Sequence, residues 1–263
     1  MFKIKIGQFS TEISISPKRL EAPISEILSG FTTTDEPDII LEARLIDELR
    51  YNDYKGPAPA IKTSDNIYRI KWYYFSGTFD TKNGYVSARI NSRPYVLTSL
   101  LRMVYAIKAV SSGGLFVHAA SFVRDNKAYL FPGKSGAGKS TLLKIAVSSD
   151  PDIEPLSDEI SYIAIEKGRP FAYSTPFWGN TKIRGHYIKA PLRKIFFIRQ
   201  SAKNYKRRTE NDETIKNMLE NSLYASVDRE SFMNSFETIK KIVAKTENSL
   251  LFFTKDSRFL EVI

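Results

Sequence analysis

A glycine-rich segment at residues 133–141 constrains the fold of this chain more than any other feature. It reads GKSGAGKST and fits the pattern G-x-x-x-x-G-K-[ST] at every fixed position. An apolar run at residues 128–131 precedes it, and apolar residues at helical spacing follow it. The glycines allow a tight turn that directs backbone N–H groups toward phosphate oxygens, and the following helix adds the positive end of its dipole. The sequence therefore predicts a strand, a phosphate-binding loop and a helix, in that order.

The residue types in this loop have distinct expected roles. Lys139 is expected to reach the β- and γ-phosphates of a nucleotide, and the Ser140 hydroxyl is expected to ligate Mg²⁺. ATP and Mg²⁺ are therefore the expected cofactors. The alternative is a glycine-rich turn that binds no nucleotide. The residues assigned to nucleotide binding are Gly133, Lys134, Ser135, Gly136, Ala137, Gly138, Lys139, Ser140 and Thr141.

A second signal is the acid pair Asp158 and Glu159, which begins 19 residues after Lys139. That interval leaves room for one helix and one returning segment, so we expect Asp158 on a neighbouring strand beside the loop. Glu154 and Pro155 interrupt the preceding run, unlike the apolar strand before a usual Walker B acid, so we expect Asp158 to do more than hold metal. The interval is too short for the signature insertion of a transporter-type ATPase. The alternative is a pair of solvated turn carboxylates.

The first part of the chain predicts a β-rich region. Alternation with period two is typical of half-buried antiparallel strands, which are expected within residues 2–6, 13–15, 67–75 and 85–90. One helix is expected over residues 19–28. Another follows Pro94 and ends before residues 111–114, which read SSGG and favour a boundary. We therefore divide the chain into an N-terminal accessory region, 1–112, and a core region, 113–263.

The core region predicts an α/β fold with a mixed sheet. A β-hairpin over residues 115–131 leads directly into the phosphate loop. After the loop, helices are expected at residues 139–148, 212–224 and 231–244, and strands at residues 160–165, 171–174, 194–198, 249–253 and 259–263.

The net charge of +10 comes from one segment. Twelve basic residues and no acid lie between Lys167 and Arg208, whereas the rest of the chain holds 27 basic and 29 acidic residues. One interpretation is a solvated face; another is a clamp for phosphate or an acidic peptide that uses Arg184, Lys189 or Arg193. Interleaved aromatic residues also raise the hypothesis of a nucleic-acid surface; they are Phe171, Tyr173, Phe177, Trp178 and Tyr187. We expect no nucleic-acid partner, because aromatic residues here suit packing better than base stacking.

Cysteine is absent, which excludes disulfides, thiolate zinc sites and thiol nucleophiles. His118 and His186 are the only histidines, so a dedicated transition-metal enzyme is not expected. The N-terminus alternates charged and apolar residues instead of forming a signal peptide, and no apolar run approaches the ~20 residues of a membrane span. We expect a cytoplasmic protein that makes no membrane contact.

Residues 114–140, together with the sequence LSDE at residues 156–159, resemble the catalytic domain of the HPr serine kinase/phosphorylase family. Four features carry the resemblance: His118 in the strand before the hairpin, the hairpin itself, the phosphate loop and the acid pair. The resemblance covers roughly residues 113–200 and implies a phosphoenolpyruvate-carboxykinase-like P-loop kinase core.

The resemblance also implies roles for single residues. Asp158 matches the general base toward an acceptor hydroxyl, and Lys139 belongs to the same catalytic set. Glu159 matches the second acid, where the family usually has Asp, which implies a metal or water ligand. His118 matches a histidine near the transferred phosphate; the alternative is a histidine satisfied within its strand.

The function implied is an ATP-dependent kinase that phosphorylates a hydroxyl, with a serine of a peptide or protein as the expected acceptor. Two alternatives stay open: a kinase for free serine or a sugar, and an ATP-binding regulatory module without catalysis. The first 110 residues differ from the regulatory domain of the bifunctional enzymes, so we expect a relative rather than the HPr enzyme itself. Residues 174–179, STPFWG, resemble peptide-tailoring relatives. Because relatives assemble as oligomers, a homo-oligomer is also expected.

Overall fold

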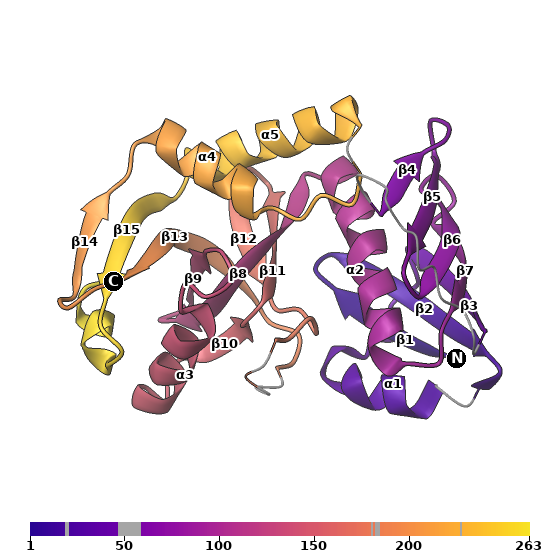
Figure 1. Cartoon of the computed structure of the whole chain (residues 1–263), viewed down its shortest axis with the longest axis horizontal. Coiled ribbons are helices and arrows are strands. Elements are labelled where there is room, and N and C mark those ends of the chain that lie inside the picture. Colours follow the sequence, from indigo (N-terminus) through magenta and orange to yellow (C-terminus); the bar gives the residue numbers. More distant parts are fainter. Residues whose placement is uncertain (19–20, 47–58, 180, 182–184, 227) are drawn as a thin grey trace. The chain divides into compact units, whose positions relative to one another are not determined.

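The structure is a computed structural model that describes residues 1–18, 21–46, 59–179, 181, 185–226 and 228–263. Its contacts divide the chain into two compact units, one of residues 1–111 with 224–233 and the other of residues 112–223 with 234–263. Each unit combines helices with a mixed sheet (Figure 1). The chain is therefore an α/β protein.

The first unit is built on a seven-stranded sheet of order β1-β2-β3-β7-β6-β5-β4. Strands β2, β3 and β7 run parallel, and the other neighbours are antiparallel. The strands are β1 (Phe2–Ile6), β2 (Phe9–Ser16), β3 (Ile39–Leu45), β4 (Ala60–Lys62), β5 (Ile67–Trp72), β6 (Phe75–Asp80) and β7 (Tyr85–Ile90). The helices are α1 (Glu21–Ile27), the short 3-10 helix η2 (Ser29–Phe31) and α2 (Pro94–Ser111).

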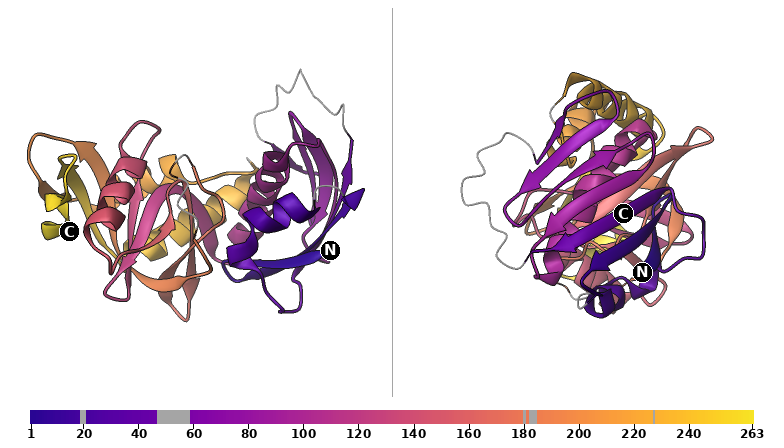
Figure 2. Two further views of the ribbon diagram at one scale, coloured as in Figure 1. Left: turned by 90° about the horizontal axis from the view of Figure 1, so that it is seen from below. Right: turned by 90° about the vertical axis from the view of Figure 1, so that its right-hand side faces the viewer.

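Helix α2 supplies the core of the first unit. Its residues Leu97, Leu100, Leu101 and Val104 are fully buried, and their spacing places them on one helical face. The helix contacts β6 and β7 and lies along one face of the sheet (Figure 2). The alternating strands therefore bury one side under α2, as period-two patterning requires.

The structure corrects three expectations in this unit. The strand expected over residues 67–75 is two strands, because the chain turns at Tyr73 and Tyr74 between β5 and β6. Strand β3 was not expected; its residues alternate between buried and exposed positions, and residues 41–45 alternate apolar and charged types in the sequence. Helix α2 continues through Ser111, whose hydroxyl donates to the Lys108 carbonyl, and Gly113 follows with a φ of 69°. Arg19 and Leu20, at the start of the expected 19–28 helix, lie outside the described residues.

The second unit is built on an eight-stranded sheet. Its strands are β8 (Gly114–Arg124), β9 (Lys127–Pro132), β10 (Glu154–Ser157), β11 (Ile160–Glu166), β12 (Arg169–Tyr173), β13 (Lys189–Gln200), β14 (Tyr205–Arg208) and β15 (Glu247–Phe253). Its helices are α3 (Lys139–Ser149), α4 (Asn211–Asn221) and α5 (Arg229–Val243), and a 3-10 helix, η3 (Ser257–Glu261), follows β15. The first five residues of α5 group with the first unit.

One run of strands in this sheet has the order β10-β8-β9-β13-β15. Strands β9, β13 and β15 are parallel. Because β8 is antiparallel to both β9 and β10, β10 runs in the same direction as β9. The carboxyl ends of β10, β9, β13 and β15 therefore lie along one edge of the sheet. Strands β11 and β12 connect the other halves of β8 and β13.

Both faces of the parallel strands are buried. Along β13, Ile195 and Phe197 pack on the side of α4 and α5, whereas Phe196 and Ile198 pack on the side of α3. Figure 1 shows α4 and α5 on one face and α3 on the other. Burial on two faces explains why this strand is a continuous apolar run instead of an alternating one.

One expectation for the second region is wrong. Residues 259–263 do not form a strand: η3 occupies this part because the Asp256 carboxylate accepts a bond from the Arg258 backbone N–H and caps the helix. The contacts group residues 224–233 with the first unit, although the sequence analysis includes them in the core region 113–263. There the Ala60 N–H donates to the Ala225 carbonyl and Lys62 pairs with Glu230.

None of the helices among the described residues combines the length and the apolarity needed to cross a membrane.

Candidate functional site

The loop predicted to bind phosphate connects β9 to α3. Gly136 and Gly138 have φ angles of 82° and 104°, in the left-handed region that favours glycine. A Cβ at Gly138 would also lie 2.9 Å from Cζ of Phe253, at the end of β15. Helix α3 then begins at Lys139. Left-handed residues in a loop before a helix turn successive backbone N–H groups into one concave site at the helix N-terminus. This geometry binds anions.

Lys139 places its ammonium within the loop. Its Nζ donates to the carbonyl oxygens of Gly133 at 2.7 Å and Lys134 at 3.1 Å, and the residue is only 6% exposed. Burial lowers the pKa of Lys139, and the charges of Glu159 and Asp158 oppose that change. A partly desolvated cation held by neutral carbonyls is suited to bind an anionic group that enters the loop.

Asp158 lies in the turn after β10. The Ser157 hydroxyl accepts bonds from the backbone N–H groups of Glu159 and Ile160, which fixes this turn. Asp158 is 1% exposed; its Oδ1 accepts from the Gly179 N–H at 2.7 Å and its Oδ2 from the Thr181 N–H at 3.2 Å. The carboxylate is therefore oriented by the backbone of another segment. Each oxygen retains a second acceptor position.

A cavity of about 510 Å³ brings most of the expected residues together. It is lined by most of the phosphate loop, by both residues of the acid pair, Asp158 and Glu159, and by His118 from β8. The expected residues that line it are His118, Ser135, Gly136, Gly138, Lys139, Ser140, Thr141, Asp158 and Glu159. The other three, Gly133, Lys134 and Ala137, belong to the loop but not to the cavity wall. The volume lies within the range of small-ligand sites.

The sequence indicates that Asp158 lies on a strand next to the loop strand. In the structure, Asp158 follows β10, which is not the direct neighbour of β9. Strand β8, with His118, lies between β9 and β10. Among the strands of the described residues, β10 pairs only with β8, so it ends that run of the sheet. An edge position accommodates Pro155, which lacks the N–H that an inner strand would need. This explains why the run before Asp158 is interrupted.

Four residues of the cavity wall were not expected to line it: Trp178, Gly179, Gln200 and Lys255. The first two lie in the segment at 174–179 that carries part of the resemblance. Gln200 ends β13 and Lys255 follows β15 by two residues. Gln200 and Lys255 could have been predicted from their positions at the ends of two strands, since ligands bind at the carboxyl ends of parallel strands. That prediction requires knowing which strands pair.

The residues expected to hold Mg²⁺, Ser140 and Glu159, both line the cavity. Across the described ranges, no group of three or more His, Asp or Glu side chains is placed to hold a metal ion. Mg²⁺ usually takes one or two protein ligands and completes its shell with substrate phosphates and water. The donor set therefore fits a cation that arrives with a nucleotide and does not fit a resident metal cage.

Part of the basic segment forms ion pairs on the protein surface. Lys189 pairs with Glu166, and Arg193 pairs with Glu247. Tyr173 and Phe177 are 1% exposed, so neither ring is available to stack on a base. Trp178 lines the cavity, and its ring also lies against Gly185. The segment also contains Lys182 and Arg184, which lie outside the described residues.

No protein-family model matches the sequence, and no curated protein matches it significantly.

Proposed function

We propose that this protein is an ATP-dependent kinase that transfers the γ-phosphoryl group to a hydroxyl, with a serine of a peptide or protein as the acceptor. The observation that carries the proposal is that the phosphate loop and Asp158 line one cavity. A nucleotide-binding loop alone would support binding; an oriented carboxylate in the same cavity supports group transfer.

In this proposal, Asp158 aligns the acceptor hydroxyl and accepts its proton. The hydroxyl oxygen forms a bond to the γ-phosphorus while the bond from that phosphorus to the β–γ bridging oxygen breaks, so ADP leaves and the proton passes to the carboxylate. Phosphoryl transfer depends on positioning and charge neutralisation more than on a strong base. The Gly179 and Thr181 N–H groups would hold the carboxylate in place for that task.

Two further groups complete the proposed site. Lys139 would neutralise charge on the β- and γ-phosphates, and Ser140 and Glu159 would hold Mg²⁺, which supplies charge neutralisation when bound. The resemblance to the HPr serine kinase/phosphorylase family supports the same assignment. On that basis, we further propose that the second unit has a phosphoenolpyruvate-carboxykinase-like P-loop kinase core.

One observation favours a second candidate function. Both oxygens of Asp158 already bind backbone N–H groups, so the residue would also serve as a clamp for Gly179 and Thr181. A clamp beside a nucleotide loop suits an ATP-binding regulatory module, in which nucleotide occupancy changes contacts with a partner and no group is transferred.

The test is incubation of the protein with γ-labelled ATP, Mg²⁺ and a lysate of the source organism, followed by separation of labelled species by size. The proposal expects a labelled peptide or protein whose signal disappears with Asp158→Asn and persists with Asp152→Asn, an exposed acid of the same type. A labelled metabolite would instead identify a small-molecule kinase. Nucleotide binding without any labelled acceptor would favour the regulatory module.

A further inference from the structure

We propose that Lys255 binds the non-terminal phosphates of the nucleotide, from the side of the phosphate loop opposite Asp158. This inference rests on the proposed function, because it assigns a second cation to the same nucleotide. The ligand class is a nucleoside di- or triphosphate, and Lys255 would act as a binding residue for the phosphates that stay with the leaving group.

The strand order places Lys255 across the loop from Asp158. The loop follows β9, Asp158 follows β10, and Lys255 follows β15, in a run of strands ordered β10-β8-β9-β13-β15. The loop strand therefore lies between the two. All three carboxyl ends point to one edge, and both Asp158 and Lys255 line the cavity there.

Direct contacts connect this far wall to the loop. Gln200 Nε2 donates to the Gly136 carbonyl oxygen at 3.4 Å. The ring of Phe253 lies so close to Gly138 that a Cβ there would be 2.9 Å from it. Phe253, two residues before Lys255, thus packs against the part of the loop that contains the two glycines with positive φ.

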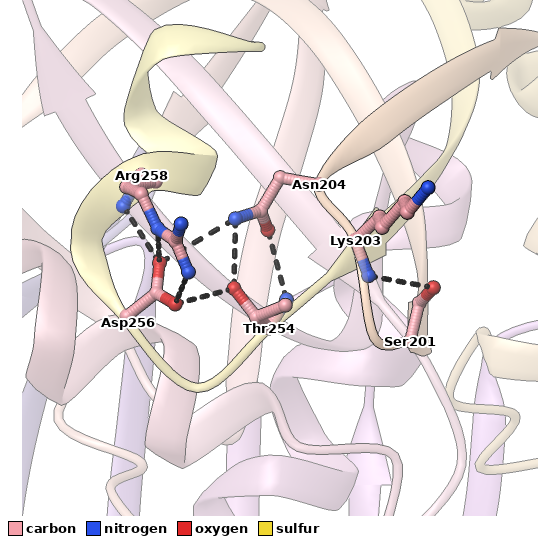
Figure 3. Close-up of polar contacts among 6 residues, drawn as sticks. All are labelled: Ser201, Lys203, Asn204, Thr254, Asp256 and Arg258. Carbon is pink, nitrogen blue, oxygen red and sulfur yellow. Dashed lines mark hydrogen bonds and ion pairs between the residues drawn. The ribbon is translucent and has the colours of Figure 1, made fainter.

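A polar network fixes the turn around Lys255 (Figure 3). The Asn204 side chain donates from Nδ2 to Oγ1 of Thr254 at 2.7 Å and accepts at Oδ1 from the Thr254 N–H at 2.8 Å. The Thr254 hydroxyl donates to Oδ2 of Asp256 at 2.7 Å. Both neighbours of Lys255 in the sequence are therefore held by side-chain hydrogen bonds, which restricts where the backbone can present the lysine.

Asp256, the acidic residue nearest in sequence to Lys255, has its carboxylate bound within the same network. Arg258 donates to Asp256 Oδ2 from Nη2 at 2.7 Å and to Oδ1 from Nε at 3.1 Å. These bonds from Arg258 are the main reason that the pKa of Asp256 is well below its usual range. Asp256 is thus neutralised by Arg258, and within the part of the chain that the structure describes no carboxylate forms an ion pair with Lys255.

The charges of the cavity then determine how a polyphosphate would lie. Asp158 and Glu159 give one side two carboxylates, and Lys255 gives the other side a cation. A triphosphate seated on the loop would place its leaving-group phosphates toward Lys255 and present the γ-phosphoryl group toward Asp158 and the acceptor. Electrostatic complementarity of this kind fixes orientation as well as affinity.

The test is the affinity of the full chain for ATP and for ADP, each with Mg²⁺, measured by calorimetric titration. Lys255→Met should weaken both nucleotides by a similar factor of about ten, equivalent to about 1.4 kcal/mol, because both carry the non-terminal phosphates. Lys255→Arg should restore most of the affinity because it keeps the charge. The matched control is Lys203→Met, an exposed lysine in the neighbouring turn that does not line the cavity. Thermal melts confirm that each variant is folded.

The possible outcomes separate this inference from the proposed function. If the unaltered protein binds neither nucleotide, the proposed function fails and this inference fails with it. If it binds both and Lys255→Met behaves like Lys203→Met, only the role of Lys255 is overturned. Loss of ATP affinity without loss of ADP affinity would place Lys255 at the terminal phosphate and would also overturn the assignment. Failure of Lys255→Arg to restore binding would show that the charge is not what matters.

Discussion

Replacement of Asp158 by Asn tests the catalytic and the structural role of this residue in one molecule. The carboxylate accepts two backbone N–H groups, from Gly179 and Thr181. An Asn side chain has one oxygen acceptor, which would keep the shorter bond to Gly179, and its amide group would face the Thr181 N–H as a second donor. Because hydrogen bonds to charged groups are worth about 1.5–3 kcal/mol, we expect Asp158→Asn to lower the free energy of unfolding by about that amount.

The effect on rate should be much larger than the effect on stability. A destabilisation of this size corresponds to a lower melting temperature by about 2–4 °C per kcal/mol for a chain of this length, and stabilities of about 5–15 kcal/mol leave the variant folded at 25 °C. Loss of a general base costs about 10²–10⁴-fold in rate. Phosphoryl transfer per folded molecule should therefore fall at least a hundredfold.

The assay combines ADP release, in the presence of the identified acceptor and at saturating ATP, with thermal melting followed by circular dichroism. Asp152→Asn removes an equal charge from an exposed turn and should change neither quantity measurably. If Asp158→Asn melts earlier yet retains a rate within about threefold of the unaltered protein, Asp158 is only a clamp for Gly179 and Thr181. The general-base argument would then be refuted.

Gly138→Ala should weaken ATP binding and destabilise the fold, because the new Cβ would meet Phe253 at 2.9 Å and φ is 104°. Gly168→Ala, at φ 75° with no atom within 4 Å of the new Cβ, should cost only backbone strain of about 1–2 kcal/mol and leave ATP affinity unchanged; equal affinities for the two variants would contradict this. Burial lowers the pKa of Lys139 below its ordinary 10.5, and a bound phosphate would favour the protonated form, so ATP affinity should be highest near neutral pH and fall as pH rises through the lowered value. An affinity that stays constant from neutral pH through 10.5, the ordinary lysine value, would count against this role for Lys139. Phe131→Ala should destabilise the second unit by about 3–5 kcal/mol in urea unfolding, since the ring is fully buried among other aromatic side chains; a loss below about 1 kcal/mol would show that the site collapses around the missing ring.

The sequence predicts best what is determined locally. The hairpin is a clear example, because Asp125 and Asn126 adopt φ angles of 51° and 57° in a two-residue turn, as Asp and Asn tolerate more readily than other side chains. The phosphate loop is another, since its glycines, its preceding strand and its helix are contiguous in sequence. Both elements form where the pattern indicates them.

The sequence predicts poorly what depends on pairing between distant strands. Gln200 and Lys255 reach the cavity because β13 lies between β9 and β15, and these strands are separated by dozens of residues. The backbone N–H groups that orient Asp158 come from a segment more than twenty residues further on. The hydrophobic periodicity of the sequence does not indicate such long-range contacts.

The C-terminal error has a different cause. Residues 259–263 are apolar enough to suggest a strand, and Phe259 is indeed fully buried. The Asp256 side chain decides the outcome by capping η3 and pairing with Arg258. A single side chain with a local backbone partner thus overrides the apolar pattern.

The antiparallel strand β8 acts as a spacer in this architecture. Adjacent strands lie about 4.8 Å apart, so its insertion separates the strand that ends in the loop from the strand that ends in Asp158 by about 9–10 Å. In the proposed kinase, this separation would leave room between the loop and Asp158 for a phosphoryl group and the oxygen that receives it. In the proposed kinase, the width of β8 would therefore set the distance between the nucleotide and the carboxylate.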